Sequence, residues 1–121
     1  MDKKLIENFI ENANLHSMGT SEGNYKIANT ASKKLTSIIH KLKKDHSVAE
    51  NFIDHLIKND NPSLIIWLSL LGKEIDYKYD IFYEKLNKIA NDKSLKFLSF
   101  DAQIMLKEIY NQSNTMTDVK K

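Results

Sequence analysis

The sequence lacks cysteine and arginine altogether, and it contains only one proline, three glycines and one tryptophan. Without cysteine, disulfide frameworks, thiolate zinc sites and cysteine nucleophiles are all excluded. Without arginine, the chain has no forked guanidinium for bidentate contacts with phosphate or guanine, which argues against sequence-specific DNA recognition. Lysine therefore supplies all 18 basic side chains, and 16 acidic residues balance them to a net charge of +2.

Long apolar runs are also missing. The longest one, residues 64–71, is interrupted by Ser69, whereas a membrane-spanning helix needs about 20 apolar residues. Acids and amides follow Lys4 closely, so we expect no signal peptide. The composition, 41% hydrophobic and 28% charged, is that of an ordinary folded protein. We therefore expect a cytoplasmic protein that has no membrane partner.

The scarcity of proline and glycine predicts long helices with short connections. Apolar residues recur at helical spacings in the stretches 5–13, 28–42, 52–57, 64–71, 81–90 and 102–110. We predict an all-α fold of about six helices in antiparallel hairpins, forming a HEAT-like α–α superhelix, with a compact helical bundle as the alternative. Residues 1–111 are predicted to be a single helical domain, and residues 112–121 a disordered polar tail.

Local signals predict where the helices begin and how they connect. Residues 16–23 contain two of the glycines, Gly19 and Gly23, and are predicted to be the loop between the first two helices. Asn61 is predicted to cap the fourth helix, and Pro62 to be its first residue. A capping box of Ser47 and Glu50 predicts a third helix that starts near Val48. The aspartates of residues 76–80 are predicted to cap the fifth helix, and Ser99 the sixth.

The sequence contains no recognisable pattern of a catalytic or metal-binding site. The histidines lack the spacing of a metal-binding helical face; they are His16, His40, His46 and His55. Residues 19–23 lack the Gly-Lys-Ser/Thr ending of a phosphate-binding loop, and there is no calcium loop or nucleophile elbow. We predict that the protein is not an enzyme and uses no metal or cofactor. The clustered lysines 41, 43 and 44 are too few for a phosphate track, so no nucleic-acid partner is expected.

Two features are candidate partner-binding sites. The first is the acidic tyrosine segment, which comprises Asp76, Tyr77, Tyr79, Asp80, Tyr83 and Glu84. Tyrosine offers rigid contact area together with a hydroxyl, and it is used at protein interfaces for that reason. The competing interpretation is a turn between helices, whose tyrosines pack against the core with their hydroxyls in water.

The second candidate is Trp67, which lies in the apolar stretch 64–71. A helix that is apolar on nearly every side must be central or covered. Trp67 and the neighbouring isoleucines form a protein-binding or dimer face if one side of this helix is uncovered. Packing in the core is the competing interpretation. It fails if Trp67→Ala keeps its melting temperature but loses a partner.

Several motifs, taken in order, resemble one bacterial family. They are Gly19-Thr20-x-x-Gly23, Ala28-Asn29, Asn61-Pro62-Ser63-Leu64 with Trp67, Asp101-Ala102 and Leu106-Lys107-Glu108. From Asn8 to Asn111, their order and spacing resemble the family catalogued as domain of unknown function 2019. The resemblance implies a short HEAT-like helical domain, and some relatives occur in toxin–immunity settings. This chain departs from the family at Ile65, where such domains usually place an arginine.

Small size, the lack of a catalytic pattern and this resemblance together predict an immunity protein. It would bind and neutralise a cognate bacterial toxin, such as a nuclease delivered by a contact-dependent or other polymorphic toxin system. In this hypothesis the acidic tyrosine segment contacts a basic surface of the toxin. The alternative is a HEAT-like protein-interaction adaptor, or a structural domain that forms a homodimer through the helix of Trp67. A third hypothesis is an enzyme or nucleic-acid binder without a recognisable motif.

Overall fold

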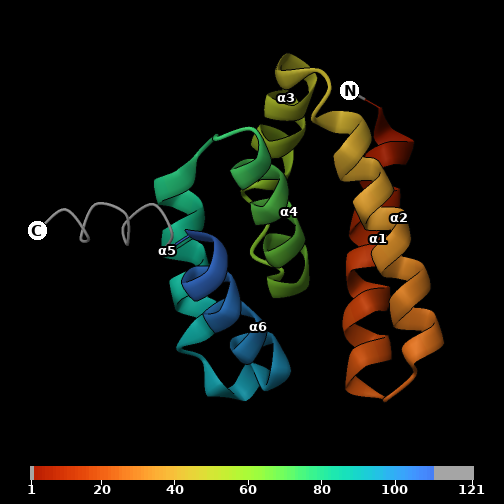
Figure 1. The fold of residues 1–121 in the computed structure, drawn as a ribbon, viewed down its shortest axis with the longest axis vertical. Helices are drawn as coiled ribbons and strands as arrows, with labels where there is room; N and C mark the ends of the chain where they lie inside the picture. The colour runs from red at the N-terminus through yellow and green to blue at the C-terminus, as the bar shows by residue number, and fades with distance from the viewer. Residues whose placement is uncertain (1, 111–121) are drawn as a thin grey trace, which may run out of the picture.

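The computed structural model describes residues 2–110, and every regular element in that range is a helix (Figure 1). The α-helices are α1 (Lys3–Ser21), α2 (Tyr25–Leu42), α3 (His46–Leu56), α4 (Pro62–Glu74), α5 (Tyr79–Ala90) and α6 (Phe97–Met105). A 3-10 turn, η1 (Lys93–Leu95), precedes α6, and a π-helical turn, η2 (Leu106–Tyr110), continues it. The predicted all-α fold is confirmed, whereas the predicted tail, 112–121, lies outside the described residues.

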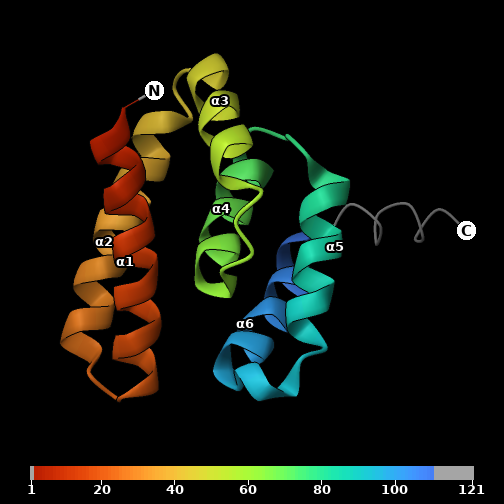
Figure 2. The same cartoon turned by 180° about the vertical axis from the view of Figure 1, so that it is seen from behind.

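The helices pair into three hairpins that stand side by side (Figures 1 and 2). The hairpins are α1 with α2, α3 with α4, and α5 with α6. Helices α2, α4 and α6 lie nearer the viewer in Figure 1, and α1, α3 and α5 lie nearer in Figure 2. Helix α4 occupies the middle and contacts each of the other five α-helices. The extended HEAT-like superhelix stays a prediction.

The predicted loop at residues 16–23 is wrong, because α1 continues to Ser21 and the turn starts only at Glu22. Gly19 is buried inside α1, where a Cβ atom would lie 2.8 Å from the backbone nitrogen of Ala28. A glycine inside a helix costs about 1 kcal/mol relative to alanine, but here it lets α1 and α2 approach closely. Gly23 alone has the turn conformation expected of it, with φ at +71°.

The N-cap of α4 is as predicted, but that of α3 is not. The Asn61 side chain accepts a hydrogen bond from the Ser63 backbone nitrogen at 3.0 Å, and Pro62 is the first helical residue. Helix α3 begins at His46, because Asp45 caps it by accepting a hydrogen bond from the Val48 backbone nitrogen at 3.3 Å. The predicted capping box of Ser47 and Glu50 is therefore wrong. Asp45 lies two residues before Ser47 and is the N-cap, so Ser47 is already inside the helix.

The predicted caps of α5 and α6 are also wrong. Lys78 precedes α5 in the left-handed conformation, with φ at 59°, and makes no side-chain cap bond. Asp80 lies in the first turn of α5, where its charge still favours the positive end of the helix dipole. Ser99 is buried inside α6, and its hydroxyl donates to the Ala90 carbonyl oxygen at 2.7 Å. Ser99 therefore ties α6 to the end of α5 instead of starting a helix.

Helix α4 forms the centre of the core, as its apolar sequence predicts. Leu64, Ile65, Leu68 and Leu71 are each no more than 2% exposed. One cluster of buried side chains includes residues from all six α-helices, so residues 2–110 share a single core. Ile65, where the resembling family usually has an arginine, is one of the most buried positions of this core.

Candidate binding groove

Two adjoining clefts lie between α4 and its neighbours. The α6 cleft, of about 190 Å³, lies between α1, α4 and α6, and its lining is His16, Ser17, Ser63, Ile66, Trp67, Leu70, Leu98, Asp101, Ile104 and Met105. The α2 cleft, of about 250 Å³, lies between α2 and α4, and its lining is Thr36, Ile39, His40, Lys43, Trp67, Leu70 and Glu74. Because the two clefts share Trp67 and Leu70, we refer to them together as the Trp67 groove.

Trp67 lies at the border between the core and this groove. Ser63, Trp67, Leu70 and Glu74 are spaced by three or four residues, so they share one face of α4. Trp67 is partly buried and packs against the core. The His16 ring from α1 meets the indole nearly at a right angle, 83°, with the ring centroids 5.1 Å apart. This contact holds the indole in place while leaving it in the lining of both clefts.

Asp101 and His16 are the titratable groups of the α6 cleft. Burial raises the pKa of the Asp101 carboxyl above its ordinary value, and the nearby His16 partly offsets this shift. Burial likewise lowers the pKa of His16 below its ordinary 6.5, and the charge of Asp101 partly offsets that. Asp101 makes no hydrogen bond or ion pair with any of residues 2–110. The cleft therefore presents a partly buried carboxylate with unused acceptor capacity.

Four other polar side chains of the groove are paired with each other. The hydroxyl oxygens of Ser17 and Ser63 lie 2.5 Å apart and share a hydrogen bond between α1 and α4. In the α2 cleft, the Lys43 ammonium forms an ion pair with the Glu74 carboxylate at 2.9 Å. This pair is well exposed to solvent, so it contributes little to stability. Because the two charges cancel, the Lys43–Glu74 pair makes this part of the α2 cleft polar but nearly neutral in net charge.

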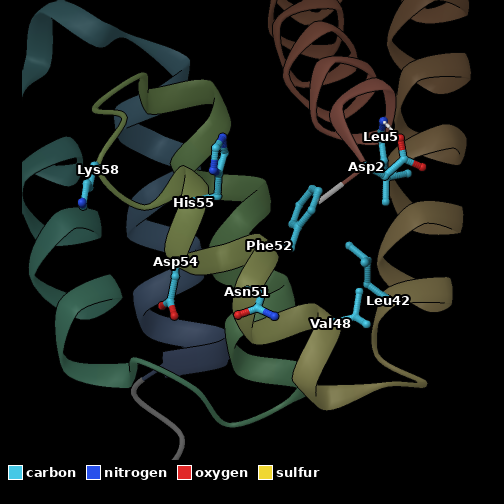
Figure 3. Close-up of a pocket in the computed structure, with 9 residues that line it drawn as sticks. All are labelled: Asp2, Leu5, Leu42, Val48, Asn51, Phe52, Asp54, His55 and Lys58. Carbon is cyan, nitrogen blue, oxygen red and sulfur yellow. Dashed lines mark hydrogen bonds between the residues drawn. The ribbon is translucent and has the colours of Figure 1, made fainter.

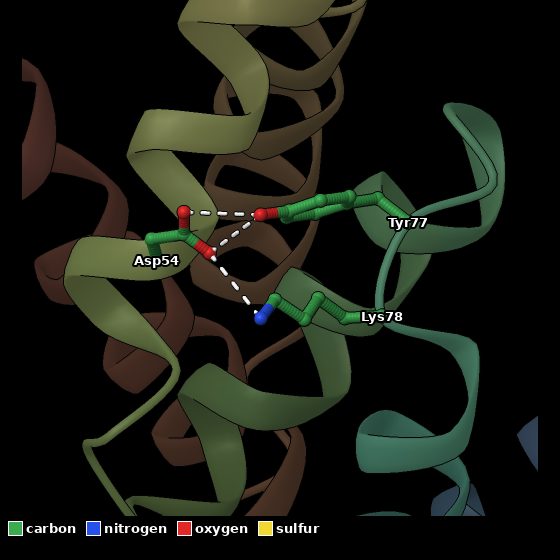
Figure 4. A network of polar contacts seen from close by, with 3 residues as sticks. All are labelled: Asp54, Tyr77 and Lys78. Carbon is green, nitrogen blue, oxygen red and sulfur yellow. Dashed lines mark hydrogen bonds and ion pairs between the residues drawn. The ribbon is translucent and has the colours of Figure 1, made fainter.

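Tyr77 of the acidic tyrosine segment is bound to another helix (Figure 4). Its hydroxyl lies 2.9 Å and 3.0 Å from the two carboxylate oxygens of Asp54 on α3 and donates to them. The Lys78 ammonium lies 4.0 Å from the same carboxylate. The hydrogen bond with Asp54 raises the pKa of the Tyr77 hydroxyl, because ionisation would place two negative charges side by side. These contacts tie the connection between α4 and α5 to α3.

Tyr79 and Tyr83 of the same segment belong to a stack of tyrosines. The Tyr79 ring lies between Tyr110, at 5.0 Å, and Tyr83, at 6.1 Å, measured between ring centroids. The Tyr79 hydroxyl donates to the Tyr110 carbonyl oxygen, and the Tyr110 hydroxyl donates to the Ser69 carbonyl oxygen at 2.6 Å. The stack therefore joins α5 and η2 to α4.

The acids of the segment are on the surface. Asp76, Asp80 and Glu84 are all exposed. None of the residues of the segment lines either cleft that contains Trp67. The two predicted binding features are therefore separate surfaces. The sequence missed His16 and Asp101 as site residues, because His16 was placed in a loop and only the packing of α1 and α6 against α4 brings the two together.

A larger depression lies elsewhere, between α1, the end of α2 and α3 (Figure 3). It has a volume of about 760 Å³. In Figure 3, Phe52 points toward Leu5, whereas Asp54, His55 and Lys58 point away in different directions. Polar groups that do not converge offer a ligand no common contact point. We therefore take the smaller Trp67 groove as the candidate site.

No protein-family model, curated protein or solved structure matches this chain. The resemblance drawn from the sequence motifs consequently stays a prediction. Within residues 2–110, no group of three or more His, Asp or Glu side chains is placed to hold a metal ion. None of the described helices combines the length and the apolar character that crossing a membrane requires.

Proposed function

We propose that this chain is an immunity protein, a binding protein that recognises a cognate toxin domain through the Trp67 groove. The main support for a binding role is the position of Trp67, which lines both clefts although most of α4 is buried. Tryptophan is enriched among the few residues that supply most of the energy at protein interfaces. An indole held in place by His16 loses little conformational freedom when a partner covers it.

The composition of the groove supports a protein partner. The two clefts share the apolar side chains of Trp67 and Leu70, and the rest of their lining includes charged groups such as Lys43 and Glu74. An apolar centre within a polar rim is the usual anatomy of a protein interface. The partner would therefore place an apolar anchor against Trp67 and polar groups around it.

The proposal that the partner is a toxin is supported by the resemblance of the sequence motifs to the bacterial family. Inhibition requires only that the bound protein cover the active site or substrate channel of the toxin. The exposed acids Asp76, Asp80 and Glu84 add a second candidate surface, which would steer a basic toxin domain during association. This surface stays a prediction beside the Trp67 groove.

The proposal predicts that the gene beside this one encodes a secreted protein with a toxin domain at its C-terminus. The test is co-purification with that domain, together with rescue of cells that produce it. We expect a stable complex and rescue of growth. Trp67→Ala should weaken binding roughly 30-fold or more, the effect of losing an interface anchor. Tyr25→Ala is the matched control, because its aromatic side chain is 74% exposed and lines neither cleft.

A toxin domain that stays active and unbound in the presence of this chain would overturn the proposal. Sedimentation velocity at low concentration addresses the alternative. A stable homodimer that Trp67→Ala dissociates would replace the immunity function with that of an adaptor or structural domain. A monomer that binds the toxin domain supports the proposal.

A further inference from the structure

The α6 cleft contains one carboxylate whose acceptor capacity is unused. Asp101 is partly buried on α6 and has neither a hydrogen bond nor an ion pair with any part of the described chain. Desolvating a carboxylate without a compensating partner is costly. By contrast, the neighbouring hydroxyls of Ser17 and Ser63 satisfy each other. A partner that brings a donor to Asp101 would recover the free energy that its burial costs.

The walls around Asp101 are aromatic and aliphatic. Trp67 and His16 provide the aromatic surface, and Leu70 and Ile66 of α4 provide the aliphatic one. His16 is the only other titratable group in the lining of the cleft. Burial lowers the pKa of His16, which disfavours the cationic form of the imidazole beside the carboxylate, and the charge of Asp101 only partly offsets this shift. The cleft thus combines one carboxylate with aromatic and aliphatic walls.

We propose that the α6 cleft receives a lysine or arginine side chain of the partner protein, with its cationic head on Asp101 and its aliphatic stem against Trp67 and Leu70. This inference rests on the proposed function for the existence of a protein partner, and it names the chemistry by which that partner is recognised. A carboxylate only accepts hydrogen bonds, so it selects a donor, and a cationic donor makes the stronger bond. The indole face favours a cation further.

The inference can be tested without the partner, because Trp67 is the only tryptophan of the chain. Its fluorescence and its indole N–H resonance report on this groove alone. The probes are Nα-acetyl-arginine amide and Nα-acetyl-lysine amide, each compared with a neutral analogue of similar shape, the citrulline and norleucine amides respectively. We expect a saturable change at Trp67 with at least one of the cationic probes and none with its neutral analogue.

Asp101→Asn removes the charge at nearly constant shape and should weaken binding of the cationic probe roughly tenfold or more. Asp80→Asn, which removes an exposed acid outside the groove, is the matched control and should bind the probe like the unchanged chain. Lowering the pH far enough to protonate Asp101 should abolish the response. Because His16 also takes up a proton as the pH falls and contacts Trp67, the titration is repeated with His16→Gln, which should lose the response in the same way.

Three outcomes would overturn the inference. They are equal responses to the cationic and neutral probes, an unchanged response in Asp101→Asn, and no response at concentrations that would saturate a millimolar site. None of them depends on the toxin domain. If the complex forms but the probes do not bind, the groove function stands and the cation site is wrong. If the probes bind but no complex forms, the site stands and its proposed partner is wrong.

Discussion

The Trp67 groove and the acidic tyrosine segment have similar residue types but use them in different ways. Both combine aromatic rings with carboxylates. In the segment, Tyr77 is hydrogen-bonded to Asp54 and Tyr79 is stacked between two other tyrosines, so these rings already have partners within the chain. In the groove, Trp67 remains in the lining of two clefts, and the Asp101 carboxylate makes no hydrogen bond or ion pair with residues 2–110 although His16 lies nearby.

Residue composition alone does not identify an interface. A tyrosine hydroxyl satisfied within the chain lowers the free energy of folding and leaves less to offer a partner. A partly buried tryptophan beside a carboxylate without a hydrogen bond has the reverse property, since a partner improves the environment of both. Substitutions in either surface should therefore affect stability and binding differently.

The largest effect should come from the tyrosine stack. Tyr110→Ala removes a fully buried ring and its hydrogen bond to Ser69, so we expect it to lower the free energy of unfolding by about 3–5 kcal/mol. Urea denaturation followed by circular dichroism measures this loss. Tyr25→Ala is the control and should leave stability unchanged. A loss below about 1 kcal/mol in Tyr110→Ala would mean that the stack is not structural.

Trp67→Ala should reduce stability less than Tyr110→Ala, by about 1–2 kcal/mol, because the indole is only partly buried and water can enter the space it leaves. Its effect on partner binding should be the greater one. The same denaturation experiment, paired with a binding measurement, separates the two effects. A stability loss equal to that of Tyr110→Ala, without a binding defect, would assign Trp67 to the core.

The pH dependence of stability should follow His16. Because its folded-state pKa lies below the unfolded value of 6.5, the unfolded chain takes up a proton first as the pH falls. Stability should therefore decrease as the pH falls from 6.5 through the folded-state pKa, and His16→Gln should remove this decrease.

NMR titration of the His16 imidazole measures its pKa directly. Asp101→Asn should lower the pKa of His16 further, since the charge of Asp101 raises that pKa. An unchanged pKa of His16 in this variant would contradict the proximity of the two side chains.

The smallest effect is expected from Tyr77→Phe. This substitution removes the hydroxyl that Asp54 accepts from, but the contact is open to solvent, where water replaces the lost hydrogen bond. The urea midpoint should hardly move. Binding to the toxin domain should also stay near that of the unchanged chain if the Trp67 groove is the recognition surface. A binding loss as large as that of Trp67→Ala would move the interface to the acidic tyrosine segment.

Local signals predicted much of the fold. Apolar spacing located all six α-helices, and Asn61 with Pro62 located the start of α4, because both depend on neighbours within a few residues. The glycine pattern misplaced the end of α1. Gly19 looked like a helix breaker, yet the close approach of Ala28 on α2 makes a glycine necessary inside the helix. The need for that glycine comes from the opposite helix, which sequence periodicity does not reveal.

Residue types and short-range spacing were enough to predict the helices, the central place of α4 and the absence of thiol chemistry. Which aromatic side chains are available to a partner depends on how the helices pack. Packing placed Tyr79 against Tyr110, and it gathered His16, Trp67 and Asp101 from three helices into one cleft. Burial and pairing are set by contacts between residues far apart in the chain, and those contacts exist only once the hairpins have packed together.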